Sequence, residues 1–221
     1  MKKAIILLSG GIDSTTTLYL ARENGFFPIA LIFDYGQRHR REIEAAKRIA
    51  GQAGCKYKIL KLDLPWKGSS LTDKRRAIPV KRSLRRIKSS IPSTYVPARN
   101  MIFLSMAASF AESVNAFAIF IGAHSEDYSG YPDCRKEFFK AFGSAMGKGT
   151  KAGRKLKIHA PLLGKRKRDI IKTAVRLNVP LGMTWSCYKG GKRPCGVCDS
   201  CFFRSRAFKE LGIEDPGLRK K

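Results

Sequence analysis

A polar, glycine-containing string follows the first apolar run of the chain. The run is AIILL (residues 4–8) and the string is SGGIDST (residues 9–15). A short, unbroken apolar run is typical of a strand in a parallel sheet that is covered on both faces. Gly10 and Gly11 permit a sharp turn and a close approach of the backbone to an anion. A helix beginning near Asp13 would point its unpaired N–H groups at the same place.

This arrangement predicts a phosphate-binding turn between a buried strand and a helix. The hydroxyl groups of Ser9, Ser14 and Thr15 would add hydrogen-bond donors to those of the backbone. The string matches neither GxxxxGK[ST] nor GxGxxG. The alternative for so short a pattern is a plain strand-to-helix turn, in which the glycines serve geometry and a Ser or Asp is the N-cap.

A second group of residues that could bind a metal lies near the C-terminus. Its spacing is C-x7-C-x2-C-x2-C, formed by Cys187, Cys195, Cys198 and Cys201. Four thiolates in one short segment predict a structural Zn²⁺ site, one per chain, with no open position for catalysis. Two disulfides are disfavoured because no secretion signal is found. Four cysteines also ligate iron–sulfur clusters, and that alternative stays open.

Composition limits the class of protein. A chain of 221 residues is long enough for one sizeable core. No apolar stretch reaches the length of a membrane span. The first apolar run is too short for a signal peptide and lacks a small-residue cleavage site. We therefore expect a cytoplasmic protein with no membrane partner.

The chain is strongly basic, with 44 Lys and Arg against 17 Asp and Glu and a formal charge of +27. Such a field attracts polyanions, which favours nucleic acid or a polyphosphate substrate. The alternative is a solvated, charge-rich surface such as thermophiles use. The charges are spread along the whole chain, with denser stretches at 74–88 and 165–168, so we favour the second interpretation. Nucleic acid is thus a permitted partner but not a required one.

The elements that must position these residues alternate between strand and helix. Strands are expected at 4–8, 28–33, 57–62, 116–121 and 156–159, and helices at 16–23, 40–53, 101–114, 135–146, 167–177 and about 202–211. Residues 64–92 are polar and basic and predict an insertion or flexible excursion. Residues 147–155 predict a flexible, hairpin-like connection.

Alternation of this kind predicts an α/β fold with an open parallel β-sheet covered by helices on both faces. We expect residues 1–182 to form this domain and residues 183–221 to form a small zinc-binding segment with a terminal helix packed on it. Ligands bind such sheets at the carboxyl ends of the strands. The loops SGGIDS, DYGQRH and GAHSEDYSGYPDC each follow an expected strand, so they should share one rim.

The string SGGIDST resembles the pyrophosphate loop of the N-type ATP pyrophosphatases, or PP-loop proteins. These enzymes split ATP into AMP and pyrophosphate while they adenylate a substrate oxygen. The resemblance implies the fold of the adenine nucleotide alpha hydrolases, with Asp13 helping to place Mg²⁺ and Phe33 near the adenine. The ATP-binding residues that it implies in the loop are Leu8, Ser9, Gly10, Gly11, Ile12, Asp13, Ser14 and Thr15.

Three later strings narrow the resemblance. DYGQRHR (34–40), VPARN (96–100) and DYSGYPDC (127–134), together with the four-cysteine segment, resemble the 7-cyano-7-deazaguanine synthases. The resemblance extends over almost the whole chain. Ile12 and Ala98 depart from it, since this family often has Gln and Gly at those two positions.

The resemblance implies an ATP-dependent C–N ligase that makes a nitrile. The substrates would be 7-carboxy-7-deazaguanine and ammonia, and the cofactors ATP, Mg²⁺ and structural Zn²⁺. The reaction would pass through an adenylated acid and an adenylated amide and supply a queuosine or archaeosine precursor. Dimers are common in the resembled family, so the resemblance also allows a homodimer.

The resemblance further implies roles for single residues. Asp13 and Ser14 would serve catalysis at the phosphates, where Arg38 would stabilise charge on the α-phosphate. A surface salt bridge is the alternative for Arg38. Arg99 would bind the substrate carboxylate through its planar fork. Asn100 is equally well explained as a helix cap.

The SGYPDC loop would bind the deazapurine. Tyr131 would stack on the base, and Asp127 or Asp133 would accept hydrogen bonds from its N–H groups, although such loops are often plain turns. His124, His159 and Cys134 are expected to be structural.

Two other functions compete with nitrile synthesis. One is a PP-loop enzyme that adenylates a tRNA base, and the other is a non-catalytic, zinc-stabilised RNA-binding module. Both predict strong, salt-dependent RNA binding, and the second leaves the SGGIDST loop unexplained. ATP turnover that requires only a small deazapurine would single out the nitrile-forming enzyme.

Overall fold

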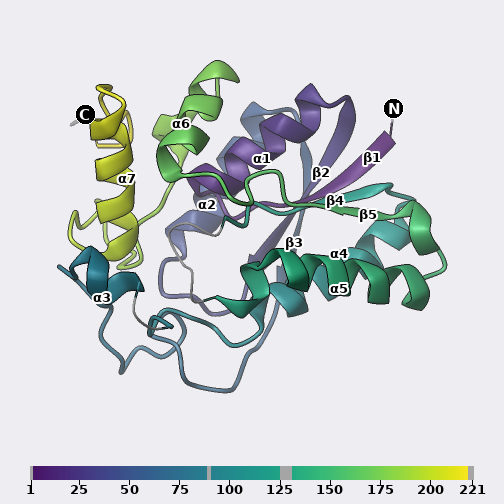
Figure 1. The fold of residues 1–221 in the computed structure, drawn as a ribbon, viewed down its shortest axis with the longest axis horizontal. Coiled ribbons are helices and arrows are strands. Elements are labelled where there is room, and N and C mark those ends of the chain that lie inside the picture. The colour runs from purple at the N-terminus through teal and green to yellow at the C-terminus, as the bar shows by residue number, and fades with distance from the viewer. Residues whose placement is uncertain (1, 89–90, 125–130, 219–221) are drawn as a thin grey trace.

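A computed structural model gives the fold of the chain, and it describes residues 2–88, 91–124 and 131–218 (Figure 1). Five strands form one parallel sheet in the order β3-β2-β1-β4-β5. The strands are β1 (Lys2–Leu7), β2 (Phe26–Asp34), β3 (Lys56–Lys61), β4 (Ala118–Phe120) and β5 (Lys157–His159). The predicted open parallel sheet is therefore confirmed.

Helices cover both faces of the sheet, with α1 and α2 on one face and α4 and α5 on the other (Figure 1). The helices are α1 (Ile12–Glu23), α2 (Arg41–Gln52), α3 (Leu84–Lys88), α4 (Arg99–Ser113), α5 (Lys136–Gly149), α6 (Lys167–Arg176) and α7 (Asp199–Glu210). Short 3₁₀ turns lie at Pro132–Cys134, Gly153–Lys155 and Leu181–Met183. The helix α5 continues to Gly149, so the connection predicted at 147–155 is wrong in its first part.

The central strand β1 is apolar on both sides because both of its faces are buried. Ile5 belongs to the core cluster that includes Leu104 of α4. Its neighbour Ile6 belongs to the opposite cluster, with Leu18 of α1 and Ile49 of α2. This double burial explains why an unbroken apolar run, and not an alternating one, marked the strand in the sequence.

The order of the strands reverses at β1, because β2 lies on one side of it and β4 on the other. In open α/β sheets, ligands bind in the crevice at such a switch point. The backbones that leave β1 and β4 approach closely there. A Cβ atom added to Gly122 would lie 2.8 Å from the backbone nitrogen of Ser14, so only glycine lets the β4 loop run against the first turn of α1.

The basic segment 64–92, predicted as an insertion or flexible excursion, contacts the rest of the fold around residues 80–82. Val80 forms an antiparallel bridge with Cys198, and the N–H of Lys81 donates to the carbonyl of Val197 at 2.9 Å. Arg82 forms an ion pair with Asp199. The insertion therefore packs against the four-cysteine segment.

The segment that carries the cysteines is joined to the rest of the fold through its helix. Phe208 of α7 shares a core cluster with Ile170 of α6 and Ile12 of α1. Buried Arg204 of α7 donates to both carboxylate oxygens of Asp215 at 2.6 and 2.7 Å. No helix within the described ranges is long and apolar enough to cross a bilayer.

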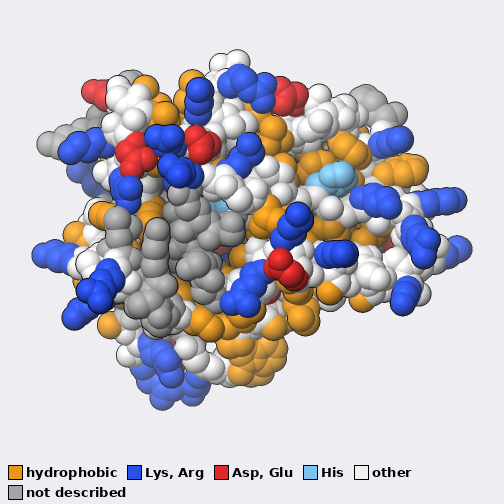
Figure 2. Space-filling model, viewed as in Figure 1, with side chains coloured by type: hydrophobic (Ala, Val, Ile, Leu, Met, Phe, Trp, Pro, Cys, Tyr) orange, Lys and Arg blue, Asp and Glu red, His pale blue; other side chains and the backbone are white. Residues whose placement is uncertain are grey.

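Positive charge is distributed over the face of the molecule that Figure 2 shows. Figure 2 shows Lys and Arg side chains spread across the visible face, with no single patch that gathers them. This agrees with the even distribution along the sequence.

Candidate active site

The loop after β1 is organised by its own hydroxyl groups. The backbone N–H of Ser9 donates to Ser14 Oγ at 3.1 Å, and the Oγ atoms of Ser9 and Ser14 lie 3.0 Å apart. Ser14 Oγ also donates to the carbonyl of Gly11 at 3.2 Å. The N-cap of α1 is Gly11, and no side chain caps the helix. The Ser or Asp N-cap of the alternative interpretation is therefore not found. The first N–H groups of a helix without a side-chain cap can bind an anion, and phosphate binding by this turn stays a prediction.

Gly10 has a structural reason for its identity. Its φ is +80°, and an added Cβ would lie 2.4 Å from the carbonyl oxygen of Glu42 and 2.6 Å from the nitrogen of Ala46. The loop therefore rests directly on the backbone of α2. This contact places the loop at the carboxyl ends of β1 and β2.

Asp13 lies in the first turn of α1 and faces the side chains of Lys167 and His124. Lys167 Nζ donates to its carboxylate oxygens at 2.8 and 2.7 Å, and His124 Nε2 lies 3.4 Å from Oδ2. Burial alone would raise the pKa of the Asp13 carboxyl, but the charges and hydrogen bonds of Lys167 and His124 outweigh it and hold the pKa well below its usual range. Asp13 is thus a carboxylate at neutral pH, as a ligand of Mg²⁺ must be.

Lys167 was missed by sequence reasoning, and His124 was expected to be only structural. Lys167 is the first residue of α6, and the basic stretch 165–168 concealed it among surface charges. His124 follows β4, on a loop that sequence reasoning had placed at this rim. That placement was the one sequence signal that could have assigned His124 to the site. The Gly122 contact shows how closely the loop meets α1.

One cavity opens at the switch point and collects most of the predicted site residues. Those that line it are Leu8, Ser9, Gly11, Ile12, Asp13, Ser14, Phe33, Arg99 and Tyr131. Residues that sequence reasoning did not assign to the site also line it, among them Tyr35, His39, Glu42, Phe103, Lys167, Trp185 and Tyr188. The expected rim of converging loops is therefore present.

Part of the cavity wall is aromatic, and the guanidinium group of Arg99 lies beside it. The rings of Phe33 and Phe103 stack with centroids 3.9 Å apart. Arg99 Nη1 donates to the hydroxyl of Tyr35 at 3.1 Å. No ion pair to Arg99 occurs among the residues that the structure describes. Its guanidinium is therefore available for a ligand carboxylate.

Tyr131 and Cys134 complete this wall. The Tyr131 hydroxyl lies 3.0 Å from Thr94 Oγ1, and burial raises the pKa of Tyr131 to about 12. Burial likewise raises the pKa of the Cys134 thiol to about 12, so it stays protonated and packs, as expected. Asn100 is not a helix cap: the N-cap of α4 is Ala98, and the Asn100 amide donates to Asp133 O and Cys134 Sγ.

Four of the predicted site residues do not line the cavity. Gly10 supports the loop from behind, and the Thr15 hydroxyl donates to the carbonyl of Gly11 at 2.7 Å. Asp133 Oδ2 accepts the backbone N–H of Asn100 at 2.8 Å. Arg38 Nη1 donates to backbone carbonyls of the basic insertion, at 2.7 Å to Arg76 and 3.4 Å to Ser70. Their assigned roles stay predictions, and Arg38 has instead a visible role in anchoring the insertion.

Two further residues complete the comparison. Asp127 lies outside the described residues. His159 packs on β5 with its ring stacked 4.7 Å from that of Phe120, which is the structural role expected of it.

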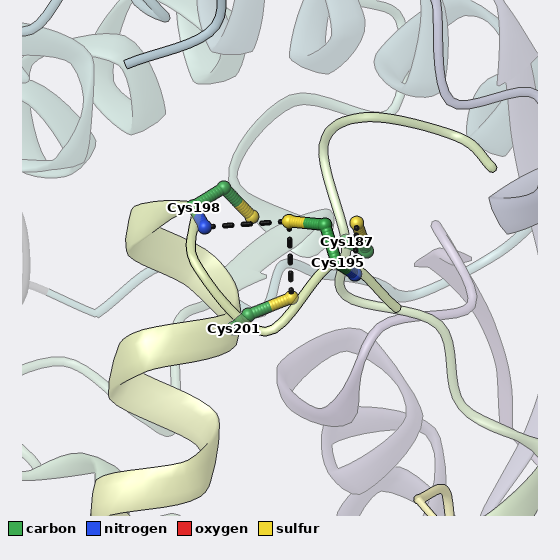
Figure 3. A group of neighbouring side chains, drawn as sticks. All are labelled: Cys187, Cys195, Cys198 and Cys201. Carbon is green, nitrogen blue, oxygen red and sulfur yellow. Dashed lines mark hydrogen bonds between the residues drawn. The ribbon is translucent and has the colours of Figure 1, made fainter. Parts of the chain in front are cut away.

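The four cysteines form a candidate metal centre next to the cavity. Cys187, Cys195, Cys198 and Cys201 are free thiols whose sulfur atoms all lie within 4.8 Å of one another. Figure 3 shows these sulfur atoms facing one another beside the start of α7. Zn–S bonds of about 2.3 Å in a tetrahedron separate the sulfurs by roughly 3.8 Å, so the donor set fits a metal ion.

This segment also forms part of the site. The N–H of Trp185 donates to the carbonyl of Gly10 at 2.9 Å, and its indole N–H donates to the carbonyl of Cys187 at 2.9 Å. Trp185, Ser186, Tyr188 and Ser200 line the cavity. One tryptophan therefore connects the candidate metal centre to the glycine-containing loop.

The parallel sheet, the loop at its switch point and the carboxylate at the start of α1 define a PP-loop protein of the adenine nucleotide alpha hydrolase-like fold. Solved structures agree on the fold: NMN synthetase from Francisella tularensis superposes with a TM-score of 0.52 at 16% identity, covering 96% of this chain and 78% of that one. A predicted subunit of tRNA methyltransferase from Methanocaldococcus jannaschii gives 0.50 at 14% identity, covering 100% and 93%.

The family follows from the sequence comparisons. The model of the family described as "Queuosine biosynthesis protein QueC" matches residues 3–212, and the chain belongs to this family. A 7-cyano-7-deazaguanine synthase from Trichodesmium erythraeum is 49% identical over 219 residues, covering 97% of this chain and 99% of the relative. One from Thermoplasma volcanium is 49% identical over 217 residues, covering 97% and 90%. The resemblance seen in the sequence is thereby confirmed.

Proposed function

We propose that the protein is a 7-cyano-7-deazaguanine synthase. It is an ATP-dependent C–N ligase that converts 7-carboxy-7-deazaguanine and ammonia to 7-cyano-7-deazaguanine, a queuosine precursor. The observation that carries this proposal is the family match over residues 3–212. The cavity supports it, since the glycine-containing loop and the guanidinium of Arg99, which has no ion pair within the described ranges, line the same space.

The chemistry explains why such an enzyme needs ATP. A carboxylate is a poor acyl donor because its leaving group would be oxide. Attack of the carboxylate on the α-phosphate releases pyrophosphate and gives an acyl-adenylate, from which AMP is a good leaving group. Ammonia then forms the amide. A second adenylation, on the amide oxygen, and loss of AMP give the nitrile, so two ATP are consumed.

The residues around α1 would serve the phosphates. The N–H groups at the start of α1 and the hydroxyls of Ser9 and Ser14 would bind the pyrophosphate moiety. The Asp13 carboxylate would hold Mg²⁺, which when bound neutralises phosphate charge. Lys167, 2.7 Å from Asp13 Oδ2, is close enough to transfer its hydrogen bonds to a phosphate oxygen.

The aromatic wall would bind the two organic substrates. Phe33 offers an apolar surface to adenine, and Tyr131 offers one to the deazapurine. Arg99 is suited to the carboxylate because its planar fork matches both oxygens. Holding this carboxylate beside the α-phosphate is the main catalytic contribution that we assign to the protein.

The four-cysteine site would hold one structural Zn²⁺. A set of four thiolates leaves no open coordination position, so the metal would fold the segment and take no part in the reaction. Free thiols of this kind suit a reducing compartment, which supports a cytoplasmic location.

The test is pyrophosphate release by the purified protein with ATP, Mg²⁺ and ammonium, with and without 7-carboxy-7-deazaguanine. We expect release to require the deazapurine and mass spectrometry to identify the nitrile. Release that occurs only on addition of tRNA would contradict the proposal and indicate a tRNA-modifying PP-loop enzyme.

A further inference from the structure

His39 is a buried histidine in the wall of the cavity. Only 4% of its surface is exposed, and it lies on the loop between β2 and α2. Its Nε2 atom lies 2.9 Å from Oε2 of Glu42. A carboxylate only accepts hydrogen bonds, so Nε2 must carry a proton and donate it. In the neutral ring the other nitrogen, Nδ1, is then a bare acceptor.

The Nδ1 atom of His39 is buried and has no hydrogen-bond partner in the part of the chain that the structure describes. Buried polar atoms almost always have a partner, and leaving one without a partner costs about 1–3 kcal/mol. Because His39 lines the cavity, a donor from a bound molecule is the natural partner once the atoms that cover Nδ1 move aside. The lone pair of Nδ1 is therefore suited to accept a hydrogen bond from a ligand.

The orientation of His39 is fixed by a chain of hydrogen bonds. Glu42 Oε1 accepts from Gln37 Nε2 at 3.0 Å, and that nitrogen also donates to the carbonyl of Phe33 at 3.0 Å. Gln37 Oε1 accepts the N–H of Tyr35 at 2.8 Å. The end of β2 thus holds Gln37, Gln37 holds Glu42, and Glu42 holds the imidazole. A base oriented by a third group is the arrangement that activates nucleophiles in enzymes.

The ring of His39 is also covered from the other side. The ring of Tyr188 lies 5.8 Å from it, and the four-cysteine segment packs so closely that a Cβ on Gly190 would lie 3.0 Å from His39 Cα. These contacts shield the imidazole from water on the side of the four-cysteine segment, while its other side borders the cavity.

We propose that His39, oriented by Glu42, is the general base that takes protons from the reacting nitrogen. This inference rests on the proposed function. As ammonia attacks the acyl-adenylate, a C–N bond forms and the C–O bond to AMP breaks, with its electron pair leaving on AMP. The proton lost by nitrogen passes to Nδ1 of His39, and the Glu42 carboxylate stabilises the imidazolium. The imidazolium returns its proton to solvent before the next cycle.

The second adenylation, which converts the amide to the nitrile, also requires a base. The amide nitrogen carries two protons, and both must leave to form the nitrile. One is lost when the amide oxygen displaces pyrophosphate from ATP. The other is lost when the C–O bond to AMP breaks and the C≡N bond is completed. His39 accepts each in turn.

The test separates adenylation from nitrogen chemistry in the variant His39→Gln. The Gln amide keeps a donor toward Glu42 but removes the acceptor at Nδ1. ATP–pyrophosphate exchange, with 7-carboxy-7-deazaguanine and no ammonium, should stay close to that of the wild type. Single-turnover amide formation with ammonium should fall by about 10²–10⁴-fold, the usual contribution of a general base. The control is His159→Gln, which makes the same change outside the cavity and should alter neither rate.

Equal losses of exchange and of amide formation, or no loss of either, would overturn the assignment of His39. If His39→Gln does not fold, the same two rates are measured in a second variant, Glu42→Gln. It should slow amide formation more than exchange, and the reverse order would also overturn the assignment. Failure of the wild type to form the nitrile would instead contradict the proposed function.

Discussion

The ammonium group of Lys167 lies 2.8 and 2.7 Å from the two carboxylate oxygens of Asp13, although 154 positions separate the residues in sequence. This ion pair occupies the oxygens that Mg²⁺ would need. Loading the site with Mg²⁺ and ATP therefore requires Lys167 to exchange its carboxylate partner for another anion, for which the phosphates are suited.

Replacing Lys167 with Met should separate its two effects. Removing the competing cation should let Mg²⁺ saturate the enzyme at a lower concentration, while the loss of a phosphate contact should lower kcat by about 10²-fold. A Mg²⁺ titration of pyrophosphate release measures both. Lys165→Met removes the same charge from an exposed neighbour and should change neither. Weaker Mg²⁺ binding by the Lys167 variant would contradict the exchange.

Asp13→Ala should abolish turnover and retain the fold. In the proposed function the carboxylate would serve the phosphate site, whereas the core around α1 is formed by Ile12, Leu18 and their neighbours. Circular dichroism and pyrophosphate release provide the two measurements. Normal product formation by this variant would eliminate Asp13 from the site.

The same residue predicts a dependence of stability on acid. Because the folded state holds the pKa of Asp13 below its ordinary value of 3.8, its ion pair stabilises the fold above that pH and loses this effect as the pH falls further. The difference in free energy of unfolding between wild type and Asp13→Asn should therefore shrink below about pH 4. Urea unfolding over a series of acid buffers measures it. A difference independent of pH would refute the ion pair as its source.

Cys198→Ser should remove the metal and reduce the yield of folded protein. Structural Zn²⁺ contributes about 10–16 kcal/mol of apparent binding free energy. Elemental analysis should find one Zn²⁺ per chain in the wild type and little in the variant. The matched control is Cys55→Ser, since Cys55 is buried outside the centre and a hydroxyl can also donate to the carbonyl of Pro28 as its thiol does. Full metal content in the Cys198 variant would exclude a four-thiolate site.

Ala98→Gly should stabilise the protein. Ala98 has a φ of +52° directly before α4, and the left-handed region costs a residue with a Cβ about 1–2 kcal/mol. This explains why the related proteins often have Gly here. We expect a gain of about 1 kcal/mol in urea unfolding, after the greater entropy loss of Gly. Asn178→Gly, at a φ of +54°, should gain less because Asn tolerates this region.

The sequence was sufficient for the architecture because the sheet is buried on both faces. That burial makes strands such as β1 continuous apolar runs and places glycine at the turns that leave them. The same logic failed where burial was uneven. The strand β4 is shorter than its apolar run, and α5 extends past Met146 through glycines that a local pattern treats as breakers.

The site was predictable only where a motif carried it. Asp13, Ser14 and Arg99 come from recognisable strings and line one cavity. Lys167 has no local signal, because its role depends on α6 beginning beside the first turn of α1. Arg38 is the opposite case: it stands in a motif, yet its guanidinium donates to a carbonyl of the insertion, and its role at the α-phosphate stays a prediction. Long-range contacts of this kind are set by tertiary packing, so no regular spacing of residues in the sequence predicts them.

The bond from Trp185 to Gly10 has a consequence for synthesis on the ribosome. Residues 9–14 leave the exit tunnel early, but the wall formed by residues 185–200 emerges far later. A nascent chain can thus form its first strand and helix while the catalytic pocket still lacks a side. ATP chemistry must wait until the distal cysteines have been translated and have folded back. Stalled or truncated chains would therefore be unable to consume ATP.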